Sequence, residues 1–226
     1  MTGLGIFWIF NMLLGTAAGR LILFAAVLWY LDNRYFGLLA ALWAPIRRAQ
    51  LIAGLRRNVE VNPSDIRSMV ELGEHYLRGG NYRLAAEYLE RAFDRGEDAP
   101  RATFLLGAVL VKLGRHAEGR ARLAEALAKQ PSIAYGEPYV YLLEAAFATE
   151  GPQSPQVAEL VAQFEHFDGV EVLTRAGQLC AGAGRHDLAR DLLEAAIHNY
   201  SFTPPKMRRR ERRWMVRARL GLLRIK

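Results

Sequence analysis

The sequence predicts an all-α protein: an N-terminal transmembrane helix, then an α-solenoid of about four helix pairs, then a C-terminal capping helix. Two observations support this prediction. Residues 1–19 contain no charged side chain. In addition, one pattern of small and apolar residues occurs three times in fixed register between residues 71 and 197. Regular recurrence of this kind is typical of stacked helical repeats, in which each unit buries its apolar face against the next.

The N-terminal segment has the composition of a membrane span. Residues 4–31 are mostly apolar and contain one charged side chain, that of Arg20, and a spanning helix needs about 20 such residues. The segment is longer and more aromatic than a signal peptide and has no basic start. We therefore expect residues 1–31 to be a transmembrane anchor.

Arg20 lies near the middle of this apolar window. An arginine at the membrane centre costs at least about 2.5–3.5 kcal/mol on insertion scales. Two interpretations stay open: the true span is shorter and Arg20 reaches the headgroups, or Arg20 pairs with an acid of another subunit.

The charges that follow the span predict its orientation. Arg47 and Arg48 belong to a group of basic residues after residue 31, and no charged side chain precedes residue 20. The positive-inside rule then places the N-terminus outside and the rest in the cytoplasm, as a single-pass membrane protein. Residues 32–62 are expected to be an interfacial linker with a half-repeat cap helix at 46–60. A short re-entrant segment at 35–45 is the alternative.

Three copies of one pattern organise the middle of the chain. The first is ELGEHYLRGGNYRLAAEYLERAF at 71–93, the second is LLGAVLVKLGRHAEGRARLAEAL at 105–127, and the third is RAGQLCAGAGRHDLARDLLEAAI at 175–197. The first two align without a gap at an offset of 34 residues, and the third follows 70 residues after the second. Gly80, Gly114 and Gly184 fall at one register position, where a turn with positive φ favours glycine.

On these residues the chain resembles the tetratricopeptide repeat family. Its layout also resembles bacterial membrane-anchored repeat proteins, which implies the bacterial inner (cytoplasmic) membrane. The resemblance implies a solenoid over residues 63–203, with repeats at about 66–99, 100–133, 136–169 and 170–203. Small residues such as Gly73 and Gly107 let the two helices of a pair approach closely. The third unit departs from the pattern because Pro152 and Pro155 occupy its turn. There we expect a longer turn, with Ser154 as the N-cap of the next helix.

Nothing in the sequence predicts catalysis. It contains none of the common nucleotide-binding, hydrolase or metalloprotease motifs. The histidines lack zinc-site spacing, and Cys180 is the only cysteine. We therefore expect no enzyme and predict no catalytic, cofactor-binding or metal-binding residues.

The resemblance implies a partner-binding groove on the first helix of each pair. Basic residues around apolar ones suggest that it binds an acidic, partly apolar peptide, and a solvated face without a ligand is the alternative. The expected groove residues are Arg67, Val70, Glu74, Arg78, Arg101, Phe104, Lys112 and Gln178.

The charge is distributed unevenly along the chain. Residues 58–205 contain 14 basic and 21 acidic groups, whereas residues 206–226 contain ten basic groups and one acid. Within 204–226, Trp214, Ala218 and Ile225 belong to one apolar stripe, and Val216, Leu220 and Leu223 form a second. A basic capping helix is therefore predicted.

The arginines of this helix are solvated, paired with the acidic repeats, or in contact with an anionic surface. The residues predicted to face a membrane or another anionic surface are Arg20, Arg47, Arg48, Arg208, Arg209, Arg210, Arg212, Arg213 and Trp214.

Two functions remain open at this level. The first is a membrane-anchored, cytoplasm-facing scaffold that recruits or stabilises other proteins, or an accessory or assembly subunit of an inner-membrane complex. The second is a membrane-tethered adaptor that binds nucleic acid or the ribosome through its Arg-rich last helix.

Overall fold

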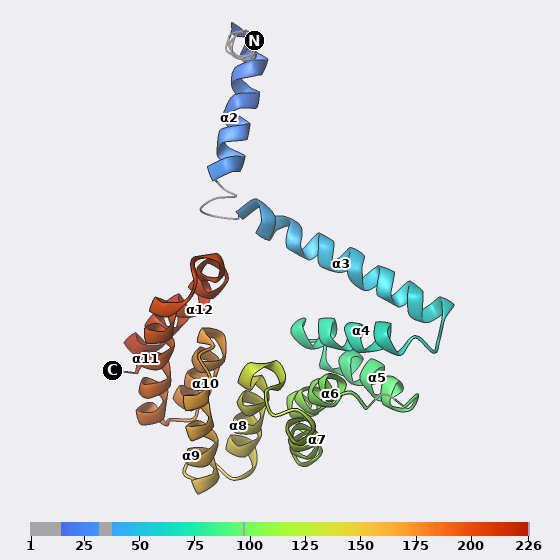
Figure 1. Ribbon diagram of the computed structural model, residues 1–226, viewed down its shortest axis with the longest axis vertical. Coiled ribbons are helices and arrows are strands. Elements are labelled where there is room, and N and C mark those ends of the chain that lie inside the picture. Colours follow the sequence, from blue (N-terminus) through green and yellow to red (C-terminus); the bar gives the residue numbers. More distant parts are fainter. Residues whose placement is uncertain (1–14, 32–37, 97, 226) are drawn as a thin grey trace. The chain divides into compact units, whose positions relative to one another are not determined.

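The computed structural model describes residues 15–31, 38–96 and 98–225, and all regular structure in these ranges is helical. The chain divides into two compact units, Met1–Arg57 and Asn58–Lys226, which are described separately. The all-α solenoid predicted from the sequence is confirmed in the second unit (Figure 1).

The first unit contains the helix α2 (Ala17–Leu31) and most of α3 (Leu38–Val61). Exposed apolar side chains of α2 include those of Leu21, Phe24 and Trp29. Among the described residues, no helix is both long enough and apolar enough to cross a membrane. Residues 1–14, which are part of the predicted anchor, lie outside the described residues.

The α3 helix differs from the sequence expectation of an apolar stretch followed by a separate cap helix at 46–60. It is one helix of 24 residues with Pro45 inside it. A proline removes one backbone hydrogen bond and often breaks a helix. Here leucine and alanine, both strong helix formers, lie on either side of Pro45 and allow the helix to continue.

The second unit consists of consecutive antiparallel helix pairs that follow one another in a curved row (Figure 1). A final helix, α12, packs on α10 and α11. The pairs are α4 (Ile66–Arg78) with α5 (Tyr82–Phe93), α6 (Pro100–Lys112) with α7 (His116–Lys129), α8 (Glu137–Thr149) with α9 (Pro155–Ala162), and α10 (Val170–Gly182) with α11 (His186–Phe202); α12 spans Pro205–Arg224, and the short 3-10 helices η2 (Ile133–Gly136) and η3 (Gln163–His166) flank the third pair.

Within a pair, a leucine of the second helix lies directly over a glycine of the first. A Cβ added at Gly73 would lie 2.5 Å from Leu89 Cγ, and one at Gly107 would lie 2.9 Å from Leu123 Cγ. The leucines are fully buried. The two helices therefore pack at a distance that any larger residue at these glycines would increase.

The turns within the pairs depend on glycine for a different reason. Gly80, Gly114 and Gly184 have φ values of +78°, +81° and +81°, a left-handed conformation that is cheap only for glycine. This confirms the turns predicted from the sequence.

The third pair has the longer turn that its prolines predicted. Ser154 is the N-cap of α9, its hydroxyl accepts a hydrogen bond from the backbone N–H of Gln156 at 3.2 Å, and Pro155 is the first helical residue. The α9 helix has eight residues and passes into η3. The predicted cap is confirmed.

The first helices of successive pairs contact one another: α4 with α6, α6 with α8, and α8 with α10. The second helices α5 and α7 instead pack on the first helix of the next pair. The closely spaced row of first helices is therefore the inner, concave side of the curve, and α5, α7, α9 and α11 lie outside (Figure 1).

The α12 helix occupies the place of a further first helix. Trp214, Ala218 and Ile225 are buried. The predicted position of Trp214 on a membrane or anionic surface is wrong, because its side chain lies in the apolar core formed with α10 and α11 and is only 8% exposed. Arg217 and Arg213 lie over the indole ring at 4.7 and 5.3 Å.

We expect Gly107→Ala to lower the free energy of unfolding by about 1–3 kcal/mol, because the new Cβ would lie 3.0 Å from the backbone nitrogen of Leu123 and 3.1 Å from the carbonyl oxygen of Gly119. Gly182→Ala in α10 is the matched control, since nothing lies within 4 Å of its added Cβ. The control should be neutral or stabilising by up to about 1 kcal/mol. Urea unfolding measures both, and equal effects would contradict the close approach.

Trp214→Ala should cost about 3–5 kcal/mol of stability, as large-to-small changes in a core do. Trp214→Phe should cost much less, because the indole Nε1 is buried and forms no hydrogen bond within the described residues. The thermal unfolding midpoints of the two variants distinguish the contribution of the packed ring from that of the indole N–H group. A Phe variant as unstable as the Ala variant would show that the indole N–H has a partner.

Candidate functional site

The concave row of first helices is held together by one ion pair at each junction between neighbouring helices. Arg101 of α6 pairs with Glu74 of α4. Lys112 Nζ of α6 lies 2.7 Å from both carboxylate oxygens of Glu144 in α8. Arg175 of α10 lies 2.6 Å from Glu137 of α8. We call these three pairs the charge ladder.

Glu74 is the most enclosed carboxylate of the ladder. Its side chain is 12% exposed and also contacts Arg78 at 2.6 Å. A buried carboxylate is costly unless it is paired, so Arg78 and Arg101 together make its position tolerable. Both arginines are exposed beyond that contact.

Two aromatic rings lie at the centre of the row. Phe104 of α6 and Tyr141 of α8 are buried, with ring centroids 6.1 Å apart. Lys112 Nζ lies 5.8 Å and Arg175 Cζ lies 5.2 Å from the Tyr141 centroid, within range of cation–π attraction. Burial raises the pKa of Tyr141, so its hydroxyl stays protonated at neutral pH.

The structure brings some of the predicted groove residues together and separates others. Glu74, Arg78 and Arg101 form one cluster, and Lys112 and Phe104 meet around Tyr141. Of the remaining predicted groove residues, Arg67 is exposed and pairs with Glu71 at 3.1 Å, Val70 is half-buried, and Gln178 is exposed on α10.

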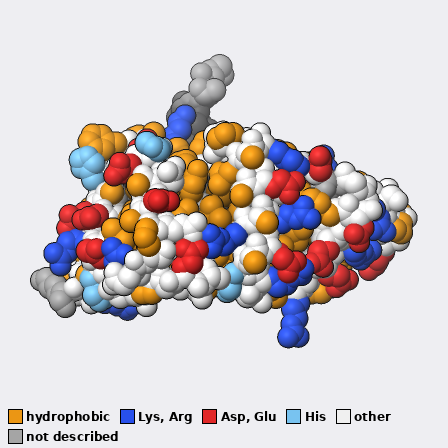
Figure 2. Space-filling model, turned by 90° about the horizontal axis from the view of Figure 1, so that it is seen from below, with side chains coloured by type: hydrophobic (Ala, Val, Ile, Leu, Met, Phe, Trp, Pro, Cys, Tyr) orange, Lys and Arg blue, Asp and Glu red, His pale blue; other side chains and the backbone are white. Residues whose placement is uncertain are grey.

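The charge ladder makes the groove less suited to the acidic peptide expected from the sequence. The cations expected to attract an acidic peptide already have carboxylate partners, which are Glu74 for Arg101 and Glu144 for Lys112. Cations and carboxylates therefore alternate along the row. Figure 2 views the molecule from below Figure 1 and so does not look onto this row; on the face that it shows, acidic and basic side chains are also interspersed, and hydrophobic side chains gather near the middle.

Sequence reasoning missed Glu137, Tyr141, Glu144 and Arg175 as members of this site. A signal for two of them was present. Glu144 takes the register position that glycine holds in the other copies, and Tyr141 precedes it by three residues, as Phe104 precedes Gly107. In the structure, however, Glu144 pairs with Lys112 of α6, whereas the glycines contact the second helix of their own pair.

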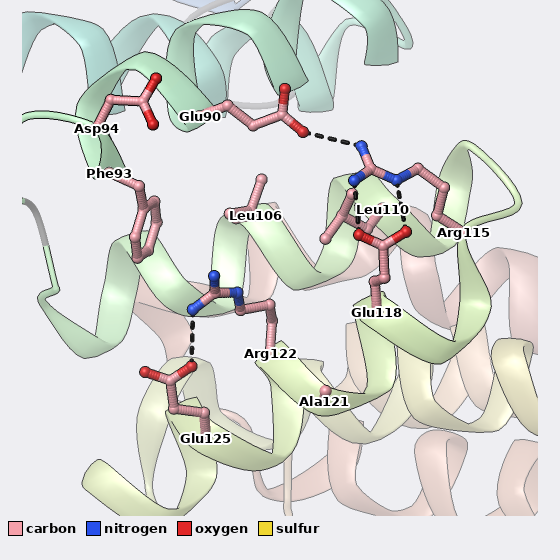
Figure 3. A pocket seen from close by; sticks show the side chains of 10 residues that line it. All are labelled: Glu90, Phe93, Asp94, Leu106, Leu110, Arg115, Glu118, Ala121, Arg122 and Glu125. Atoms are coloured by element: carbon pink, nitrogen blue, oxygen red, sulfur yellow. Dashed lines mark hydrogen bonds and ion pairs between the residues drawn. The ribbon is translucent and has the colours of Figure 1, made fainter.

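A second hollow, of about 460 Å³, lies between α5, α6 and α7 (Figure 3). Phe93, Leu106 and Leu110 form its apolar part. Arg115 lies at its edge, 2.9 Å from Glu90 and 2.6 Å from Glu118. The other lining residues are Asp94, Ala121, Arg122 and Glu125.

The edge of this hollow is closed by its own ion pairs. Arg122 lies 3.0 Å from Glu125 and 5.2 Å from the ring centroid of Phe93. Hydrogen bonds from Arg115 lower the pKa of Glu118, so that carboxylate stays ionised and paired at neutral pH. Arg115 and Arg122 at the edge of the hollow therefore already have carboxylate partners within the chain.

The residues predicted to face a membrane or another anionic surface divide between the two units. Arg20 in α2 and Arg47 in α3 are exposed, and Arg48 is half-buried. Arg208 has a structural role, since its guanidinium donates to the carbonyls of Thr203 at 2.8 Å and Ser201 at 3.1 Å and so caps the end of α11. The remaining exposed arginines of this set are Arg209, Arg210, Arg212 and Arg213.

Residues 70–134 match the family model described as tetratricopeptide repeat. This stretch covers α5, α6, α7 and most of α4, and it confirms the sequence resemblance for the first two repeats. No curated protein matches the chain.

The solved structures of PilF and MamA show the same fold. PilF of Pseudomonas aeruginosa is 17% identical, covers 86% of this chain and 91% of its own, and superposes with a TM-score of 0.52. The MamA protein is 17% identical, with coverages of 66% and 81% and a TM-score of 0.50. YrrB, described as a TPR protein with an unusual peptide-binding site, is 22% identical, with coverages of 71% and 82% and a TM-score of 0.47.

We expect a double-mutant cycle on Lys112→Met and Glu144→Gln to give a coupling free energy of about 1 kcal/mol or more. The two side chains are only 27% and 25% exposed, so solvent screens their attraction weakly. The control cycle removes Arg67 and Glu71, which are 88% and 37% exposed, and should give less than about 0.5 kcal/mol. A coupling for Lys112 and Glu144 no larger than the control would show that the ladder does not hold α6 to α8.

Proposed function

We propose that this protein is a membrane-anchored protein-interaction scaffold whose concave row of first helices binds a peptide segment of a partner. The observation behind the proposal is the charge ladder around Phe104 and Tyr141. Three ion pairs, Glu74–Arg101, Lys112–Glu144 and Glu137–Arg175, cross successive helices on the same side. They present donors and acceptors next to a buried aromatic pair, a combination suited to holding an extended or helical peptide.

The alternation of charge favours a partner segment with both signs rather than a purely acidic one. A carboxylate on the partner would compete with Glu144 for Lys112, and the freed Glu144 would need a cation from the same segment. An unpaired, partly buried carboxylate is costly, so a partner that brings only acids gains less. This replaces the acidic, partly apolar peptide expected from the sequence.

The membrane part of the proposal places an anchor in residues 1–31, with the N-terminus outside and the repeat unit in the cytoplasm of a bacterial inner membrane. It is supported by the uncharged residues 1–19 and by the exposed apolar side chains Leu21, Phe24 and Trp29 of α2. In this setting the repeat unit recruits partners or serves as an accessory or assembly subunit of a membrane complex. We propose a binding function and no catalysis.

Orientation is testable with an introduced thiol. Cys180 is buried, and burial raises its pKa to about 12, so it does not report accessibility. In the full chain, a cysteine at the exposed Ala158 of α9 should resist an impermeant thiol reagent in intact cells and react after lysis. Reaction in intact cells would overturn the orientation, and release of the protein by carbonate would overturn the anchor.

In a second candidate function, the protein is an adaptor that binds nucleic acid through α12. The favouring observation is that Arg212, Arg219 and Arg224 are exposed and form no ion pair with any described residue. Ribonuclease treatment of the purified, detergent-solubilised protein tests it. Copurifying RNA that is lost when these arginines become glutamates would support this function.

The groove itself is tested by charge reversal. We expect Lys112→Glu, on the concave row, to reduce copurification of partner proteins in mild detergent by about tenfold or more, because a carboxylate of the partner would then meet a like charge, which costs several kcal/mol. Lys129→Glu on α7 is the control, because Lys129 pairs with Glu125 at 3.0 Å outside the row. Mass spectrometry quantifies the partners. Equal recovery of partners with both variants would mean that the row is not the binding site.

A further inference from the structure

Exposed apolar side chains are concentrated at the C-terminal end of the repeat unit. Among its described residues seven large hydrophobic side chains are exposed, and two of them, Val61 and Tyr135, lie elsewhere. The other five lie within 22 residues: Phe202, Met207, Val216, Leu220 and Leu223. Several exposed apolar side chains in one region indicate a contact with another molecule or a membrane.

Three of these side chains form a line along the outside of α12. Val216, Leu220 and Leu223 are spaced i, i+4 and i+7, which puts them on one side of a helix. The buried residues Trp214 and Ala218 lie on the opposite side. The outer face of a capping helix is normally polar, so this apolar line exceeds what a cap requires.

Arginines flank the line on both sides. At about 100° per residue, Arg212 and Arg219 fall on one side of it and Arg213 and Arg224 on the other. All four are exposed, and Arg212, Arg219 and Arg224 form no hydrogen bond or ion pair with the described residues. Among the described residues of the repeats, by contrast, thirteen ion pairs join residues between Arg67 and Asp187.

The only acid of the helix does not neutralise this face. Glu211 is half-buried, and its Oε2 atom is enclosed without a hydrogen-bond partner among the described residues. It lies on the same side of α12 as Trp214 and Ala218, away from Val216 and Leu220. The outer face of α12 is therefore apolar and cationic, with no carboxylate.

We infer that the outer face of α12 lies in the headgroup region of an anionic lipid bilayer. Aliphatic side chains in a line enter the boundary with the acyl chains, while arginines on both sides bind phosphate groups. This inference rests on the membrane part of the proposed function and gives the repeat unit its own, reversible contact with the bilayer.

Nucleic acid fits this surface less well. Single-stranded RNA or DNA binds by stacking its bases on exposed aromatic rings, and aliphatic side chains offer no such platform. The one aromatic residue of α12, Trp214, is buried and covered by Arg213 and Arg217. A nucleic-acid site would use the arginines and leave Val216, Leu220 and Leu223 exposed to water.

The test uses the full chain with a fluorescent reporter at one position. An environment-sensitive dye is attached to Leu220→Cys on the line, or to Ala158→Cys on α9 as the matched control; both sites are exposed and Cys180 is buried. The protein is mixed with vesicles of phosphatidylcholine alone or of phosphatidylcholine with phosphatidylglycerol, and flotation measures how much protein the vesicles hold.

With phosphatidylglycerol, the dye at residue 220 should shift to shorter wavelength and be quenched by lipid-borne quenchers, while the dye at residue 158 should not respond. High salt should reverse the signal. Changing Arg212, Arg219 and Arg224 together to glutamine should weaken the contact by about a hundredfold, at roughly fivefold per cation. These side chains are exposed, so the unfolding midpoint should not move.

The outcomes separate this inference from the anchor. If the dye at residue 220 remains in water on vesicles that hold the protein, the α12 inference is wrong and the anchor stands. If the protein fails to float with phosphatidylcholine alone but the dye responds on anionic vesicles, the anchor is wrong and the α12 inference stands. A response to RNA or to an acidic protein in place of vesicles would overturn the inference.

Discussion

The repeat unit depends on the close approach of two helices where a leucine lies over a glycine. At Gly73, Gly107 and Gly177 the missing side chain leaves room for Leu89, Leu123 and Leu193. The contact recurs at one register position in the first, second and fourth pairs, and units that repeat the same packing stack into a regular curve. Gly221 of α12 meets Leu193 in the same manner, which fits the last helix into the series.

The curve determines which side chains meet. It places the first helices side by side, so charges that are 27, 32 and 38 residues apart in the sequence form the charge ladder. Helix packing decides which charged side chains form ion pairs with one another. Because positive and negative charges alternate, the proposed groove can bind fewer kinds of partner peptide. The unit therefore has its binding chemistry on the concave side, where neighbouring repeats each contribute one charge.

The two departures from regularity are functional candidates for a shared reason. In the third pair a glutamate replaces the glycine of the other copies, and in α12 three aliphatic residues replace the polar face of a cap. Neither change improves packing, since Glu144 and the α12 line both face outward from the core. Features that packing does not require are the ones on which the groove and membrane proposals are built.

The sequence by itself determined the left-handed glycine turns, the Ser154 cap and the all-α class, because each depends on residues within a few positions of one another. It also determined the repeat period, because the same local pattern recurs along the chain. The resemblance to the tetratricopeptide repeat family implied a groove on the first helix of each pair, and the structure places these helices in the concave row. Only the tertiary structure decided that Lys112 and Arg101 are already paired, that Tyr141 completes the aromatic centre, and that Trp214 is buried. These facts depend on how far each helix rotates against its neighbour, which is set by packing between repeats and not by any local pattern.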